Sequence, residues 1–324
     1  MSRLHRSRLH RVIPIVTVAL LAAACGGSSS GKSAVSGSGA TPDNHLVVLQ
    51  DDKHLQNSDN VVAVVRIKVA KQPLIDALNK VDTTITQSDL VAMNKRAANH
   101  DDPATIAGDY ASQKNLTAGV GGGSGKVVVG AANFSESEVL ANLYVAVLKK
   151  AGYSASVKNV QSREVYEPAL EHGQLDVMPE YAATLTEFLN TRINGSKAAP
   201  LASPDITKTL AALKTLAAKR GLEPLEPSTA TDENAFAVRK DFAAANHLTT
   251  LSDLANYHGK LVLGGPPECP TRPYCELGLE KTYGIHFTGF KALDVGGPIT
   301  IAAIRNGNVQ IGLVFSSDPS LAGG

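Results

Sequence analysis

Apolar, β-branched runs alternate with helix-like segments from residue 46 onward. The strand-like runs cover residues 46–49, 61–69, 126–130, 154–160, 175–178, 235–239, 261–264, 292–295 and 310–315. The helix-like segments cover residues 73–81, 86–100, 103–114, 135–151, 165–172, 183–190, 204–220, 251–256, 276–283 and 298–306. Strands that alternate with helices favour parallel sheets with helices on both faces. The sequence therefore predicts an α/β fold with parallel-rich sheets.

Local signals mark two ends of the segment at 135–151. Ser135 is followed three residues later by Glu138, which is the pattern of a capping box. Gly152 stands where a glycine often ends a helix. Before this segment, residues 119–125 are glycine-rich but lack the Walker A pattern, because Val127 stands where a Ser or Thr should bind Mg²⁺. We interpret residues 119–125 as a flexible connector.

The first 25 residues have the pattern of an export signal. Four arginines precede an apolar run of 13 residues at 12–24, which is shorter than the roughly 20 residues that span a bilayer. The run ends at Cys25 in a sequence that resembles a bacterial lipobox, so Cys25 is the expected lipidation site. A plain signal peptide with an incidental cysteine is the alternative. Residues 26–39 are rich in Gly and Ser and predict a tether.

Charge argues against a nucleic-acid partner. The 324-residue chain carries a formal charge of +1, and cleavage before Cys25 would remove four arginines and no acidic residue, which gives −3. General nucleic-acid binders usually have a basic excess. With 43% hydrophobic residues, the chain is long and apolar enough for two ordinary domains.

Two further cysteines, Cys269 and Cys275, lie in a proline-rich segment. In an exported protein, such a pair favours a disulfide. A metal or redox pair is the alternative, although the spacing is not C-x-x-C and no His lies between them. No G-x-S-x-G or H-E-x-x-H motif is present. We therefore predict no catalytic residue, no metal site and no cofactor.

Several strand-like runs end in polar or aromatic strings. These strings occupy residues 130–136, 162–170, 176–181, 271–273 and 312–318. In open α/β sheets the carboxyl ends of the strands face the ligand crevice, and helix N-termini offer free N–H groups. The strings are therefore expected at a ligand-binding site.

Taken in order, these strings resemble the substrate-binding proteins of glycine betaine/choline/carnitine (osmoprotectant) ABC importers. The matching positions are residues 133–136, Tyr166, 176–181, 237–241, 266–273 and 315–318. The resemblance implies a two-lobed, type II periplasmic-binding-protein-like fold with its ligand cleft between the lobes. It also implies a small-molecule solute, a membrane permease and an ATPase as partners, and a non-enzymatic role. The expected protein is a monomer, exported and lipid-anchored to the outer face of the bacterial cell membrane.

The resemblance also implies how a quaternary ammonium is bound. Such a cation has no N–H to donate, so it is recognised by aromatic faces, and the carboxylate of a betaine favours Arg. We assign Tyr166, Tyr181 and Phe315 to an aromatic cage, Arg272 to an anionic end, and Asn133 and Thr231 to polar contacts.

The order of the segments differs from that of the family. The segment at 44–52 follows the Phe-Ser-Ser-Asp string in the family but comes first here, so the chain resembles a circular permutant. The expected domains are a signal at 1–25, a tether at 26–45, lobe 1 at 46–119 and 126–180 around a linker at 120–125, lobe 2 at 181–315, and a hinge return and tail at 316–324. The alternatives are a ligand-sensing module or permuted biosensor scaffold, a non-betaine solute, and a secreted hydrolase, which the missing nucleophile motif disfavours.

Overall fold

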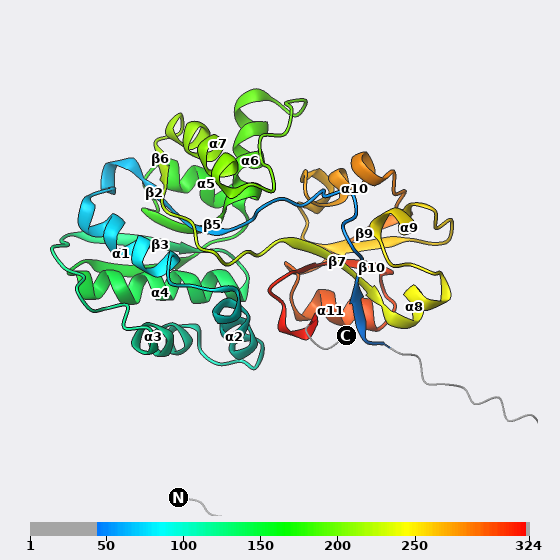
Figure 1. Cartoon of the computed structure of the whole chain (residues 1–324), viewed down its shortest axis with the longest axis horizontal. Helices are drawn as coiled ribbons and strands as arrows, with labels where there is room; N and C mark the ends of the chain where they lie inside the picture. Colours follow the sequence, from blue (N-terminus) through cyan, green and yellow to red (C-terminus); the bar gives the residue numbers. More distant parts are fainter. Residues whose placement is uncertain (1–43, 322–324) are drawn as a thin grey trace, which may run out of the picture. The chain divides into compact units, whose positions relative to one another are not determined.

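The computed structural model describes residues 44–321, which form two five-stranded sheets (Figure 1). The first sheet has the order β4 (Ser154–Asn159), β3 (Lys126–Ala131), β5 (Val177–Tyr181), β2 (Val61–Arg66) and β6 (Leu222–Pro224). The second has the order β1 (Leu46–Val48), β7 (Asn234–Arg239), β10 (Ile311–Phe315), β8 (Val262–Gly265) and β9 (Gly289–Ala292). We call each sheet with its helices the first and the second lobe. The predicted signal, Cys25 and most of the tether lie outside the described residues.

Both sheets are mixed. In the first lobe β3 runs parallel to β4 and β5, whereas β2 runs antiparallel to β5 and β6. In the second lobe β8 runs parallel to β9 and β10, whereas β7 runs antiparallel to β1 and β10. The α/β fold is confirmed, but the sheets are less parallel than expected. The reason is that β1 leads to β2, and β6 to β7, without a helix that could return the chain to the same sheet in parallel.

Alternating side chains of β2 pack into the apolar cores on the two faces of the first sheet. Val61, Ala63 and Val65 pack on one face with α1 (Gln72–Asp82), α2 (Gln87–Ala98), α3 (Pro103–Gln113) and α4 (Ser135–Ala151). Val62 and Val64 pack on the other face with α5 (Arg163–Glu171), α6 (Ala182–Asn194) and α7 (Ile206–Ala218). Because successive strand residues point to opposite faces, an unbroken apolar run is what a strand between two helical layers needs.

The second lobe repeats this arrangement. Phe236 and Val238 of β7 pack with α8 (Lys240–Ala245), α9 (Leu251–Ala255) and α10 (Glu276–Tyr283). Ala237 packs on the opposite face with α11 (Pro298–Arg305). None of the helices in the described part of the chain combines the length and apolar character needed to cross a membrane.

Several predicted boundaries move. The strand expected at 61–69 ends at Arg66, and the chain continues as the 3-10 helix η1 (Ile67–Val69). The strand expected at 292–295 lies earlier in the chain, at β9 (Gly289–Ala292). Neither β6 nor α8 was predicted. The N-cap of α4 is Phe134, so the capping-box prediction at Ser135 is wrong. Gly152 does end α4, with a φ of 108° that favours glycine.

The chain passes between the sheets twice, at residues 49–60 and 225–233. A bridge between Asn60 and Thr231 joins the two crossing segments. The expected lobe boundaries at 46 and 181 are therefore wrong, since β1 belongs to the second sheet and β6 to the first. The hinge return expected at 316–324 stays a prediction, and Ser317 there donates to Glu136 of the first lobe at 2.8 Å. Sheet membership depends on pairing between distant segments, such as β1 with β7, and no single run of residues encodes it.

Candidate functional site

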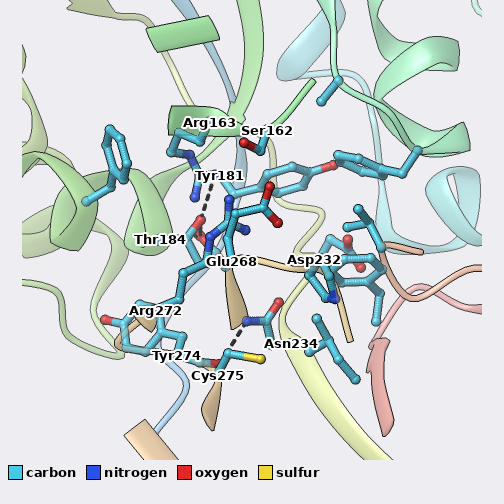
Figure 2. Close-up of a pocket in the computed structure, with 18 of the residues that line it drawn as sticks. Ser162, Arg163, Tyr181, Thr184, Asp232, Asn234, Glu268, Arg272, Tyr274 and Cys275 are labelled. Carbon is cyan, nitrogen blue, oxygen red and sulfur yellow. Dashed lines mark hydrogen bonds between the residues drawn. The ribbon is translucent and has the colours of Figure 1, made fainter. Parts of the chain in front are cut away.

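A cavity between the two lobes is lined by side chains from both (Figure 2). Four strands end at this cavity: Asn133 follows β3, Tyr181 ends β5, Pro266 follows β8 and Phe315 ends β10. This position agrees with the expected crevice at the carboxyl ends of the strands. The cavity volume is about 90 Å³. At ~10–15 Å³ for each water, it holds roughly six to nine water-sized groups, which is the scale of a small solute.

Aromatic rings form one wall of the cavity. The ring centroid of Phe134 lies 6.2 Å from that of Tyr181 and 5.8 Å from that of Phe315. Tyr166 and Tyr274 also line the cavity. Because Phe315 belongs to the second lobe and Phe134 to the first, this wall is continuous only when the two lobes are together.

Hydrogen bonds hold the tyrosine hydroxyls. Tyr181 Oη donates to Glu136 at 2.6 Å, and Tyr166 Oη donates to Glu180 at 2.8 Å. Asn57 Nδ2 donates to Tyr274 Oη at 3.0 Å. Tyr166 and Tyr181 are only 5% and 8% exposed, so these contacts fix ring positions inside the protein. Their hydroxyls are satisfied by the protein, which leaves the apolar rings as the recognition surface.

A buried ion pair supports this wall. Arg163 donates to both carboxylate oxygens of Glu180, at 3.0 and 2.7 Å. The same guanidinium donates to Thr184 Oγ1 at 3.0 Å (Figure 2). Glu180 is 1% exposed and Arg163 8%. A bidentate pair of this kind fixes the geometry of the residues around it, here including Tyr166.

Buried carboxyl groups surround the rings. Burial raises the pKa of Asp59 to about 7. The hydrogen bonds that its carboxylate accepts from the N–H groups of Thr184 and Ala183 lower the pKa but do not offset burial. Burial and the neighbouring Glu136 raise the pKa of Asp232 well above its usual range. Because Asp59 lines the cavity, the site can gain or lose negative charge near neutral pH.

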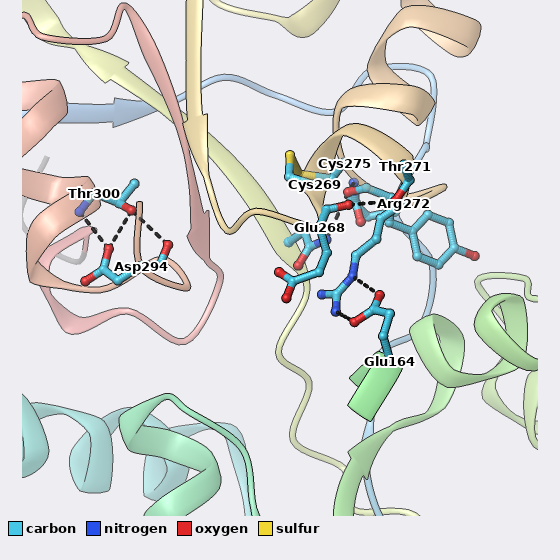
Figure 3. Close-up of a disulfide and its surroundings, with 11 residues drawn as sticks. Glu164, Glu268, Cys269, Thr271, Arg272, Cys275, Asp294 and Thr300 are labelled. Carbon is cyan, nitrogen blue, oxygen red and sulfur yellow. Dashed lines mark hydrogen bonds and ion pairs between the residues drawn. A yellow bond between two sulfur atoms is a disulfide. The ribbon is translucent and has the colours of Figure 1, made fainter. Parts of the chain in front are cut away.

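A second ion pair joins the lobes at the rim of the cavity (Figure 3). Arg272 of the second lobe donates to both oxygens of Glu164 in α5 of the first, at 3.2 and 2.9 Å. Arg272 lies in a loop that the disulfide between Cys269 and Cys275 closes. The predicted disulfide is thus present. It restrains the loop that carries Arg272.

Five of the six residues predicted for the ligand line the cavity: Asn133, Tyr166, Tyr181, Arg272 and Phe315. Thr231 does not line the cavity, and its assignment as a ligand contact stays a prediction. Its N–H donates to Gln87 Oε1 at 2.8 Å, and it belongs to the second crossing segment. The lipidation assignment at Cys25 lies outside the described residues.

Several residues that line the cavity were not predicted from the sequence: Asp59, Phe134, Phe188, Asp232, Glu268 and Tyr274. Phe134, Glu268 and Tyr274 stand within or beside the strings that pointed to the site. Asp59 and Asp232 lie in the crossing segments, which have no strand or helix pattern to mark them. Among the residues that the structure describes, no group of three or more His, Cys, Asp or Glu side chains is placed to hold a metal ion.

Two mixed α/β lobes with an aromatic-lined cavity between them define a solute-binding protein of the periplasmic-binding-protein type, in agreement with the predicted type II fold. The model of the substrate-binding domain of ABC-type glycine betaine transport systems matches residues 34–113 and 125–323. The chain belongs to this family, which confirms the family inferred from the ordered strings.

Two relatives carry related names. The glycine betaine-binding protein YehZ of Escherichia coli is 27% identical over 207 residues, which cover 60% of this chain and 66% of that protein. A glycine-betaine-binding protein of Pseudomonas aeruginosa is 25% identical over 187 residues, 55% of this chain and 58% of that protein. The chain thus spans less than two thirds of the length of each. Among solved structures, the oligopeptide-binding protein OppA aligns with 57% of this chain and 42% of its own at 9% identity, with a TM-score of 0.26 that carries no argument.

Proposed function

We propose that the chain is the extracytoplasmic substrate-binding protein of an ABC importer and binds a quaternary-ammonium solute in the cavity between its lobes. The observation that carries this proposal is the aromatic wall of Phe134, Tyr181 and Phe315. A quaternary ammonium is attracted to each ring face by about 0.5–2 kcal/mol, more as water is excluded. Tyr166 completes the cage, and Asn133 is the exposed polar contact at its edge.

Calorimetric titration with choline, glycine betaine and carnitine tests this function. At least one should bind, and Tyr181→Leu should weaken it at least about tenfold, since about 1.4 kcal/mol corresponds to a tenfold change. Phe315→Leu tests the same wall at a half-buried position if the first variant does not fold. Tyr257→Leu removes a ring that packs on Phe242 outside the cavity and should leave binding unchanged. Failure of all three solutes to bind would reject the proposal.

Family membership supports delivery to a permease and its ATPase and a role outside the cytoplasm. We further propose that Cys25 carries a lipid anchor and that the protein acts as a monomer. Cys25→Ala should move the protein from the membrane fraction to the soluble fraction of cells. Persistence in the membrane fraction would contradict the anchor, and a dimer in size-exclusion chromatography with light scattering would contradict the monomer.

A permuted chain order is the proposal for the domain arrangement. The family model matches two blocks that are separated only by residues 114–124, next to the glycine-rich connector. In addition, η3 (Pro319–Leu321) lies against β1, so the two ends of the described chain are neighbours. A chain rebuilt with residues 41–113 after residue 321 should therefore fold and bind with an unchanged Kd. Loss of folding in the rebuilt chain would contradict this proposal.

A further inference from the structure

Both arginines of the cavity are already bound to carboxylates. Arg163 forms its bidentate pair with Glu180, whose carboxylate also accepts from Tyr166. Arg272 forms its bidentate pair with Glu164. Each of these pairs is formally neutral, so neither offers a net positive charge to a ligand. A ligand carboxylate at Arg272 would have to displace Glu164 or share one guanidinium with it.

The remaining ionisable groups of the lining are acidic. They are Asp59, Glu187, Asp232 and Glu268. Glu187 accepts N–H groups of Leu201 and Ala202, and Asp59 those of Ala183 and Thr184. These contacts hold the two carboxyl groups in fixed positions, but none of them supplies a countercharge.

Glu268 differs from the other three acids. It is half-buried, and within the described residues no Lys, Arg or His lies within 4.0 Å of its carboxylate. It stands on the loop that carries Arg272, immediately before the disulfide (Figure 3). Figure 2 shows its side chain among those gathered at the centre of the cavity, between the labels of Tyr181 and Arg272.

We propose that Glu268 is a specificity-determining residue that makes this cavity select a quaternary ammonium without a carboxylate over a betaine. This inference rests on the proposed function and narrows its ligand class. A trimethylammonium group against the rings would have Glu268 as its countercharge, with an alcohol or other neutral group at its far end. A betaine would add its carboxylate to a site where Glu268 already lacks a cationic partner, and like charges repel.

The Glu164–Arg272 pair is the second element of the selection. It crosses from α5 to the disulfide loop, so it holds the rim together while it occupies the guanidinium. Removal of the Glu164 charge would release Arg272 for a ligand carboxylate. The two glutamates thus favour the same ligand class through different groups: Glu268 stabilises the bound cation, and Glu164 keeps Arg272 from binding a ligand carboxylate.

The test compares the Kd values of choline and glycine betaine in three variants. Wild type should bind choline about tenfold or more tightly than glycine betaine. Glu268→Gln should raise the Kd of choline about tenfold and so reduce the preference for choline over glycine betaine. Glu164→Gln should reduce the same preference by lowering the Kd of glycine betaine several-fold. Glu280→Gln removes an exposed charge from α10 outside the cavity and should leave the ratio unchanged.

Each contrary result has a distinct meaning. Tighter binding of glycine betaine than of choline by wild type would overturn the selection while leaving the proposed function intact. An unchanged ratio in Glu268→Gln would overturn the role of Glu268, and an unchanged ratio in Glu164→Gln that of the rim pair. If the wild type binds neither of these two solutes and no other quaternary amine, the proposed function itself is rejected.

Discussion

Asp82 is a fully buried carboxyl group at the end of α1, and its ionisation should make stability depend on pH. Its oxygens accept hydrogen bonds from Tyr144 Oη and from the N–H of Ala63, both at 2.7 Å. Burial nevertheless raises the pKa of Asp82 to about 7 from the ordinary value of 3.8. Between these two values the folded chain holds a proton that the unfolded chain has already lost.

The sign of the effect follows from this difference. Folded protein binds more protons than unfolded protein between about pH 4 and pH 7, so the free energy of unfolding falls as the pH rises through this window. A difference of roughly three pKa units corresponds to about 4 kcal/mol. Below pH 4 the contribution of Asp82 is fully present, and above pH 7 it is lost.

Asp82→Asn isolates this contribution. An amide can still accept from Ala63 and can donate to Tyr144, but it does not titrate. Urea unfolding between pH 4 and pH 8 should show the wild type losing about 4 kcal/mol relative to Asp82→Asn as the pH rises. Asp76→Asn changes an exposed residue of the same helix and should follow the wild type at every pH. Parallel curves for wild type and Asp82→Asn would refute the reasoning.

Three further outcomes are expected. Asp59 lines the cavity, and burial raises its pKa to about 7, so the Kd for a cationic ligand should fall as the pH rises from 6 to 8. A calorimetric Kd that does not change with pH, as expected for Asp59→Asn, would contradict this. Replacement of Cys269 and Cys275 by Ser should lower the free energy of unfolding by about 2 kcal/mol, and no change in urea unfolding would show that the disulfide is energetically silent. Gly278→Ala would place a Cβ 1.8 Å from the carbonyl oxygen of Pro273, so thermal unfolding should report a loss of about 3 kcal/mol, and wild-type stability would contradict the close approach.

Local patterns were enough to predict most elements of the fold. The unbroken apolar run of β2 reflects burial on both faces, and Gly152 reflects the left-handed backbone conformation of the residue that ends α4. The antiparallel pairs β1–β7 and β2–β6 were not predictable in the same way, because they join segments that are far apart in the sequence. The positions of the two crossing segments depend on those pairs, because the pairs decide to which lobe β1 and β6 belong.

The candidate site divides along the same line. Tyr181 and Phe315 were found because each ends a strand, and strand ends converge on one crevice. Thr231 does not line the cavity, because the crossing segment places it against Asn60 and Gln87. The pairing of Arg272 with Glu164, 108 residues away, also follows only from the assembled lobes. Residue type suggested a free guanidinium there, whereas the fold supplies its partner.

The central claim is that aromatic rings between the lobes bind a cationic trimethylammonium group. The most direct test is calorimetric titration with choline and with its neutral isostere, in which a tert-butyl group replaces the trimethylammonium. The two have nearly the same shape and apolar area, so they differ in charge alone. With two or more rings contributing about 0.5–2 kcal/mol each, choline should bind at least about fivefold more tightly. Equal affinity for the two ligands would contradict the account.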